Sequence, residues 1–158
     1  MYKYIFFLLF PFFFMLSCEL EQTQNDVYGC CDDQAWNYNL NTTIHADSLC
    51  IYNFSISTPS EGDLFNQGES ASITWAGGDS ETNIFLSVVN AETDSIEFIL
   101  SESMENTLFF DWNNIQTNNE NFLPGDKKIY ILQDLNKDDT QNIDSLLYNF
   151  SSIFTILE

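Results

Sequence analysis

The sequence predicts an all-β chain in which one antiparallel β-sandwich, residues 53–158, follows a signal peptide and a small disulfide-stapled loop module. Three observations lead to this prediction. Beyond residue 53, apolar and polar residues alternate in short runs that turn-forming residues separate. No long run in this region has helical spacing. The chain is 44 % hydrophobic and contains 15 Phe, which is enough apolar material to fill a core.

The first segment, residues 1–17, has the pattern of an export signal. One cation, Lys3, precedes an apolar run that is too short to span roughly 30 Å of hydrocarbon as a helix. Ser17 followed by Cys18 resembles the lipobox of bacterial lipoproteins, in which a small residue precedes a cysteine that becomes diacylated. The resemblance implies an exported chain that acyl groups such as palmitate on Cys18 anchor at the outer membrane or cell surface. The alternative is an ordinary signal peptide that is cut near Ser17.

Residues 18–28 are polar and acidic and lack periodicity, so we expect a tether there. A cysteine module follows over residues 29–52. An exported chain meets an oxidising compartment, so we expect a disulfide. Adjacent Cys30 and Cys31 pair with each other only with difficulty, and one of them should therefore bond Cys50.

The pattern around these cysteines resembles the short repeat GCTDPxAxNYNPxATxDDGSCxY of secreted and surface proteins of marine Gram-negative bacteria. The matching residues are Gly29, Cys30, Asp32, Ala35, Asn37, Tyr38, Asn39, Thr43, Ser48, Cys50 and Tyr52. The chain departs from the repeat at Cys31, where Thr is usual, and at Leu40, where Pro is usual. The resemblance implies a Cys30–Cys50 bridge and leaves Cys31 as the odd thiol.

The polar residues of the module allow two interpretations. Hard cations bind several oxygen ligands, so Asp32, Asn37, Asn39 or Asp47 would suit a calcium site. The same residue types also build Asx turns in a stapled loop, and we favour this interpretation. His45 is the one histidine of the chain, and we expect it to be solvated, because the spacing identifies no partner for it.

Seven strands are expected in the sandwich, and seven strands at this spacing favour two packed antiparallel sheets. The expected strands are residues 53–58, 70–76, 83–90, 95–101, 106–112, 127–134 and 146–157. Alternation places one apolar stripe of each strand inward. The expected inward residues are Ala71, Ile73, Trp75, Ile84, Leu86, Val88, Ile96, Phe98, Leu100, Leu108, Phe110, Trp112, Phe154 and Ile156.

One strand and the tryptophans need separate comment. Residues 127–134 are apolar on both sides, so alternation does not assign the inward face of this strand. Trp75 and Trp112 lie on apolar stripes, and we expect them in the core rather than in a sugar-stacking platform. Trp36 has polar neighbours and should be exposed.

The start of the sandwich has a second resemblance. Residues 56–75 fit the pattern I-x-x-P-x-x-G-x-x-x-x-x-G-x-x-x-x-I-x-W, and residues 151–156 fit S-x-x-F-x-I. Both are similar to the immunoglobulin-like domain of the Ser-Thr-rich, glycosylphosphatidylinositol-anchored fungal membrane proteins tied to cell-wall β-1,6-glucan synthesis. The resemblance implies an immunoglobulin-like fold. The residues that carry this resemblance are glycines, a proline and tryptophans, whose roles in the family are structural, so the resemblance implies no catalytic residue.

Charge excludes several functions. The chain has 4 Lys plus Arg against 24 Asp plus Glu, a net charge of −20 and no arginine, so neither nucleic acid nor anionic lipid headgroups are expected partners. A single histidine and the absence of arginine make an enzyme improbable. We therefore expect a non-catalytic cell-envelope lipoprotein, a surface binding, adhesion or structural module with a glycan or protein ligand. The rival is a carbohydrate-active enzyme that uses paired carboxylates, or an accessory subunit of a surface glycan-handling complex.

One acidic cluster near the carboxyl end is a candidate calcium site. It begins like an EF-hand loop but has Asp139 where the turn needs Gly, and Ser145 where a bidentate Glu is needed. The two interpretations are a loop site for Ca²⁺, which would relieve repulsion among the acids, and a solvated acidic hairpin loop. No other cofactor is expected. The candidate ligands are Asp134, Asn136, Asp138 and Asp144.

Overall fold

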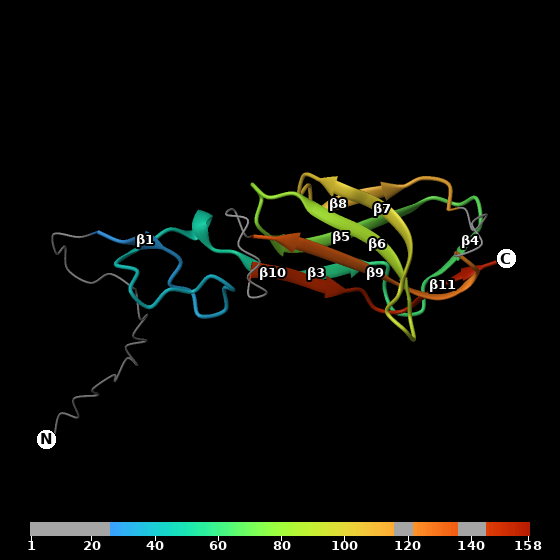
Figure 1. Cartoon of the computed structure of the whole chain (residues 1–158), viewed down its shortest axis with the longest axis horizontal. Coiled ribbons are helices and arrows are strands. Elements are labelled where there is room, and N and C mark those ends of the chain that lie inside the picture. The colour runs from blue at the N-terminus through green and yellow to red at the C-terminus, as the bar shows by residue number, and fades with distance from the viewer. Residues whose placement is uncertain (1–25, 116–121, 136–144) are drawn as a thin grey trace, which may run out of the picture.

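The computed structural model describes residues 26–115, 122–135 and 145–158, and confirms the all-β prediction. The cysteine module contains two short parallel strands and one 3₁₀ turn, and it lies at one end of the sandwich (Figure 1). The elements are β1 (Tyr28–Gly29), β2 (Ile44–His45), η1 (Asp47–Leu49), β3 (Tyr52–Thr58), β4 (Leu64–Asn66), β5 (Ala71–Gly78), β6 (Ile84–Asn90), β7 (Ile96–Met104), β8 (Phe109–Trp112), β9 (Gly125–Asp134), β10 (Leu146–Phe150) and β11 (Phe154–Leu157).

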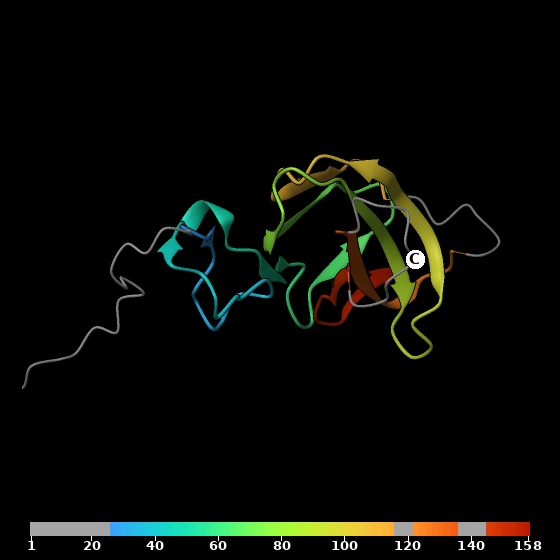
Figure 2. The ribbon, with the colours of Figure 1, turned by 60° about the vertical axis from the view of Figure 1, so that its left-hand side comes forward.

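Two sheets form the sandwich. The larger sheet has the strand order β4-β11-β9-β6-β7, and β10 also pairs with β9. The smaller sheet has the order β3-β5-β8. All pairs in the two sheets are antiparallel except β4 with β11. The two sheets face each other (Figure 2), which is the immunoglobulin-like architecture that the sequence predicts.

The inward faces of both sheets supply the core. Trp75 and Trp112 are 4 % and 5 % exposed, so their assignment to the core is confirmed. The Trp75 indole N–H donates to Asn106 Oδ1 at 2.8 Å, which satisfies its buried donor. The fully or nearly fully buried apolar residues are Phe54, Ile73, Trp75, Ile84, Leu86, Val88, Trp112, Ile115, Phe122, Ile129, Ile131, Leu147, Phe154 and Ile156.

The predicted strands are confirmed in place, but the strand count is wrong at two points. The expected strand 146–157 is two strands, because the ladder is interrupted at Ser151: its N–H donates to Ile129 O at 2.9 Å, but the Ile129 N–H donates to the Ser151 hydroxyl, at 2.8 Å. The sequence does not predict strand β4. It has three residues, which is too short for alternation to reveal, and pairing with β11 lets the Phe65 ring meet that of Phe154 at 5.7 Å.

Two expected inward residues lie outside. Leu108 is 48 % exposed because it precedes β8 in a left-handed conformation with φ +66°, and Ile96 is 52 % exposed at the start of β7. Near the end of β5, the backbone at Gly77 runs so close to β3 that a Cβ there would overlap the Asn53 carbonyl oxygen. Its φ of +90° also suits only glycine.

The structure assigns the faces of β9. Ile129 and Ile131 are fully buried, so they face inward, and the alternating Tyr130 and Leu132 face outward. The inward side also carries Lys127, whose Nζ lies 2.9 Å from Glu97 Oε2 on β7.

No helix within residues 26–115, 122–135 and 145–158 is long and apolar enough to cross a membrane.

Candidate functional site

The disulfide of the cysteine module joins Cys30 to Cys50, as predicted. Cys30 is 1 % exposed, so the bridge forms the centre of the module together with Ala35 and Thr42. Cys31 stays outside the bridge. The lipidation residue predicted at Cys18 lies outside the described residues.

The polar residues of the module bond within it, which supports the Asx-turn interpretation. The Asp32 carboxylate accepts hydrogen bonds from Gln34 N–H at 2.9 Å and from the Tyr52 hydroxyl at 2.8 Å, and these bonds lower the pKa of Asp32. Asn37 bridges two backbone groups, donating to Leu49 O at 2.6 Å and accepting from Ile51 N–H at 2.8 Å.

The expectation that His45 has no partner is wrong. Its Nε2 lies 2.6 Å from Asp47 Oδ1, and its Nδ1 accepts a hydrogen bond from Cys31 N–H at 3.1 Å. Because Nδ1 accepts, the proton of the neutral ring belongs on Nε2, where it faces the carboxylate. Both ring nitrogens are therefore engaged in holding the module together, and the spacing of two residues between His45 and Asp47 was the available signal.

The predicted calcium loop is only partly described. Asp134, at the end of β9, is exposed and its Oδ1 accepts a hydrogen bond from Ser145 Oγ at 3.1 Å. The other predicted ligands, Asn136, Asp138 and Asp144, lie outside the described residues, so the calcium prediction remains a prediction.

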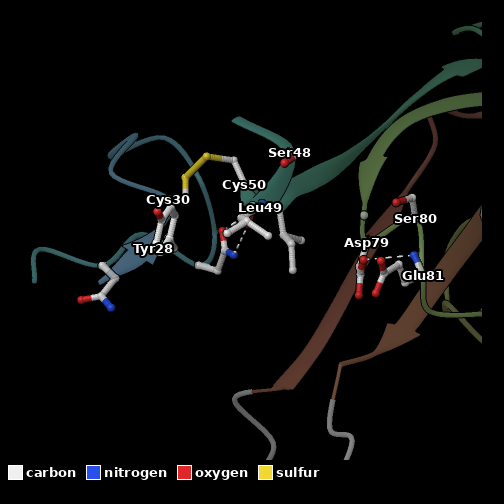
Figure 3. A pocket seen from close by; sticks show the side chains of 13 residues that line it. Tyr28, Cys30, Ser48, Leu49, Cys50, Asp79, Ser80 and Glu81 are labelled. Atoms are coloured by element: carbon white, nitrogen blue, oxygen red, sulfur yellow. Dashed lines mark hydrogen bonds between the residues drawn. A yellow bond between two sulfur atoms is a disulfide. The ribbon is translucent and has the colours of Figure 1, made fainter. Parts of the chain in front are cut away.

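A pocket of about 500 Å³ lies between the module and the sandwich (Figure 3). The disulfide and Tyr28 border it on one side, and the loop with Asp79 and Glu81 borders it on the other. Both Asp79 carboxylate oxygens already accept hydrogen bonds, from Glu81 N–H at 3.1 Å and from Thr82 Oγ1 at 2.8 Å. None of the residues that line this pocket is Lys, Arg or His. Its chemistry is thus that of a polar, acidic crevice without a paired base.

The outer face of the larger sheet is the more distinctive surface. Cross-strand pairing aligns two neighbouring rows of outward side chains on it, each of which crosses several strands. We call this surface the aromatic face. The first row is Phe85, Leu132 and Tyr148, and the second row is Ile99, Ser87, Tyr130 and Phe150.

The rings of the aromatic face contact one another. Tyr130 stacks on Phe150 with centroids 4.9 Å apart, and its ring lies 6.2 Å from Tyr148 and 6.3 Å from Phe85. Tyr148 is 57 % exposed, and Ile99 is 44 % exposed at the other end of the second row. The rings thus form one continuous cluster that remains open to solvent on its outer side.

Charge is balanced at this face. Lys128 Nζ lies 5.7 Å from the centroid of the Phe150 ring and 3.0 Å from Asp94 Oδ1, so its charge is paired. The Tyr130 hydroxyl has a raised pKa, because burial and then the neighbouring Tyr148 disfavour the phenolate. The Tyr130 hydroxyl is therefore a neutral group at ordinary pH.

Three hydroxyls of the aromatic face have no hydrogen-bond partner among the residues that the structure describes. Within the described part of the chain, neither the Tyr130 nor the Tyr148 hydroxyl makes a hydrogen bond. The buried Ser87 hydroxyl, between Tyr130 and Ile99, also has no partner among the described residues. The Ser87 hydroxyl is buried beneath the rings, so the exposed Tyr148 side chain is the part of this surface that offers both apolar area and a hydroxyl to solvent.

The outer face of the smaller sheet has the opposite character. Hydroxyl groups cover it and bond to one another: Ser57 Oγ lies 2.8 Å from Thr74 Oγ1, and Thr58 Oγ1 lies 2.7 Å from the same atom. Phe109 is the large apolar exception there, at 52 % exposure. One outer face is therefore satisfied internally, and the other is not.

Sequence reasoning missed the aromatic face. The signal was present in residues 127–134, which are apolar on both sides. The tryptophans are the more conspicuous aromatic residues of the sequence, and Trp36 is exposed as predicted, at 39 %.

Comparisons with known proteins identify no family. No protein-family model matches the chain, and no curated protein matches it. Among solved structures, it is similar to the fibronectin(III)-like modules of Clostridium thermocellum CbhA, with 12 % identity and a TM-score of 0.41 over 66 % of this chain and 45 % of that chain. It is also similar to Dpr1 IG1 in its complex with DIP-eta IG1, with 12 % identity and a TM-score of 0.32 over 66 % of this chain and 96 % of that chain. The chain thus spans under half the length of the first structure, and the fold assignment rests on its own strand order.

Proposed function

We propose that this chain is an exported, non-catalytic lipoprotein that presents its β-sandwich as a binding module at the cell surface. In this proposal Cys18 carries the lipid anchor, residues 18–28 form the tether, and the aromatic face is the docking surface. Several acyl chains on one cysteine provide stable anchoring, since each buried CH₂ contributes about 0.8 kcal/mol. The Cys30–Cys50 disulfide supports the exported location.

The asymmetry between the two outer faces carries the proposal. An antiparallel sheet that faces water ordinarily alternates apolar inside with polar outside, as β3 and β5 do with Ser57 and Thr74. Strands β9 and β10 instead place Tyr130, Tyr148 and Phe150 on the outer side. A continuous exposed apolar patch on a soluble domain is typical of an interaction site.

The hydrogen bonds of His45 in the cysteine module support a non-catalytic role. Acyl transfer by a serine or cysteine nucleophile needs a base, most often histidine. His45 is the one histidine of the chain, and both of its ring nitrogens hold neighbouring groups of the module.

Site-specific photocrosslinking of the anchored protein tests the docking surface, and it works for a ligand of any identity. A photoreactive p-benzoylphenylalanine in place of Tyr148 should yield a crosslinked product on the intact cell. The same residue in place of Phe109, equally exposed on the opposite sheet, should not. Equal products at both positions, or none at Tyr148, would overturn the proposal.

Intact mass of the same membrane-extracted protein tests the anchor. We expect residues 18–158 plus a diacylglyceryl group and one further acyl chain. An unmodified mass would remove the lipoprotein part of the proposal.

A further inference from the structure

Three polar side chains, Asn90, Glu97 and Lys127, meet where strands β6, β7 and β9 lie side by side. We infer that Lys127 Nζ forms an isopeptide bond with Asn90 Cγ, with Glu97 as the group that transfers the protons and ammonia as the leaving group. This inference goes beyond the proposed function and depends on neither the aromatic face nor the lipid anchor. The reaction takes place once in each chain, so it is compatible with a module that converts no external substrate.

Strand pairing brings the two reacting side chains together. Asn90 and Lys127 are directly opposite each other on the antiparallel strands β6 and β9. Directly opposite residues point to the same face of a sheet, with their Cβ atoms about 4.5–5.5 Å apart. Asn90 comes two positions after the buried Val88, and Lys127 comes two positions before the buried Ile129. Both side chains therefore lie on the inner side of the larger sheet.

The Glu97 carboxylate contacts both reacting groups. Its Oε2 lies 2.9 Å from Lys127 Nζ, and its Oε1 accepts a hydrogen bond from Asn90 Nδ2 at 2.9 Å. One carboxylate thus lies beside the protons that the amine must lose and beside the nitrogen that must leave as ammonia. A positioned side chain accelerates both kinds of proton transfer.

The side-chain carbonyl of Asn90 is already polarised for attack. Its Oδ1 accepts hydrogen bonds from Glu92 N–H at 3.0 Å and from Thr93 N–H at 3.1 Å. Attack on Cγ places negative charge on Oδ1, and backbone N–H groups that already point at this atom stabilise the charge. A turn between β6 and β7 needs only these two bonds, so the contact of Nδ2 with Glu97 is additional to the needs of the turn.

The surroundings of the amine are apolar. Lys127 is 2 % exposed, and its Nζ lies 5.9 Å from the centroid of the fully buried Phe122 ring. Phe98 stacks on Phe122 from β7. Two charges in such surroundings carry a desolvation cost, which the transfer of one proton from Lys127 to Glu97 removes. The neutral amine that results is the nucleophile, and its fixed position beside the Asn90 amide replaces a collision in solution.

The reaction balances without an oxidant, a reductant or a further reactant. After one proton has passed from Lys127 Nζ to Glu97, the amine lone pair attacks Asn90 Cγ and forms the new C–N bond. Glu97 donates that proton to Nδ2 and accepts a second proton from Nζ. The Cγ–Nδ2 bond then breaks, and ammonia leaves with the second proton as ammonium, which returns Glu97 to the carboxylate form.

The ion pair of Lys127 with Glu97 is the state of the chain before this reaction. Stability changes that follow from the charge pair alone therefore refer to chains in which the bond has not formed. Once formed, the bond joins β6 covalently to β9 and restricts the unfolded chain, as a disulfide does.

Peptide mass spectrometry of the membrane-extracted full chain tests the inference. After denaturation and chymotryptic digestion, we expect a branched product that joins the peptides of Asn90 and Lys127 and has the summed mass of the two minus one ammonia. Acetylation of the denatured chain before digestion should modify Lys128 and leave Lys127 unmodified.

Two variants separate the reaction from the fold. Glu97→Gln preserves the size of the side chain but removes the proton acceptor, so the branched product should be absent and both peptides should have their full mass. Lys128→Met is the matched control, because this neighbouring lysine is paired with Asp94 and takes no part in the reaction. It should leave the branched product unchanged, and circular dichroism establishes that both variants fold.

The wild-type chain alone can overturn the inference, whether or not the variants fold. Separate peptides of full mass, with Lys127 acetylated, would show that the three side chains form a buried ion pair and nothing more. Loss of ammonia from the Asn90 peptide without a branched product would also overturn it, because a cyclic imide between Asn90 and its own backbone has that mass. A branched product that persists in Glu97→Gln would overturn the role of Glu97.

Discussion

Replacing both Cys30 and Cys50 with serine should unfold the cysteine module and leave the sandwich folded. The bridge closes a loop with a sequence separation of 20 residues, and the chain-entropy relation gives a stabilisation of about 3 kcal/mol for a loop of this length. The module buries only a small centre around Cys30, Ala35 and Thr42. A core of that size does not offset the loss of about 3 kcal/mol.

Hydrogen exchange followed by mass spectrometry measures this directly. Peptides within residues 29–50 should lose protection in the double variant, while peptides from β6 and β9 should keep theirs. Cys31→Ser is the matched control and should change neither region, because Cys31 lies outside the bridge. Module peptides that stay protected without the bridge would refute the reasoning, since hydrogen bonds such as those of Asn37 would then suffice.

Three further predictions concern buried or hydrogen-bonded polar groups. Lys127→Met should lower the free energy of unfolding, measured in urea, by roughly 3 kcal/mol, because it leaves the charge of the half-buried Glu97 unpaired. A second change in the same chain, Glu97→Leu, should restore most of this stability. Trp75→Phe should cost about 1–3 kcal/mol in the same assay, because Asn106 Oδ1 loses its buried donor; a neutral result would mean that water replaces the indole. The pKa of Asp32 is lowered from 3.8 in the folded chain, so its hydrogen bonds stabilise the module fully above that pH and lose this effect as the pH falls through the lowered pKa. Asp32→Asn should therefore flatten the acid dependence of module exchange protection below about pH 4, and an unchanged acid profile would contradict this.

Alternation of apolar and polar residues correctly predicted the strands that bury only one of their two faces. Ile73 and Trp75 alternate with polar neighbours, and both are buried as predicted. The disulfide followed from a resemblance combined with the exclusion of an adjacent pair. In these cases one stretch of sequence contains all the required information.

Alternation failed where both faces of a strand are apolar or where a polar group is buried by distant partners. Gln133 on β9 is only 1 % exposed, and its side-chain amide is bonded to the backbone of Asp79, which lies 54 positions earlier in the chain. The amide donates to Asp79 O at 2.8 Å and accepts from Asp79 N–H at 2.7 Å. No local pattern contains such a contact. Likewise the aromatic face exists only because β6, β9 and β10 lie side by side, which brings Phe85, Tyr130 and Tyr148 together.

Hydroxyl-radical footprinting of the anchored protein on intact cells tests the central claim, that the aromatic face is the occupied surface. Oxidation of Tyr148 and Phe150 should fall on the cell relative to the purified chain, while oxidation of Phe109 on the opposite sheet should be the same in both. Equal oxidation of all three rings in the two samples, or protection of Phe109 alone, would contradict the account.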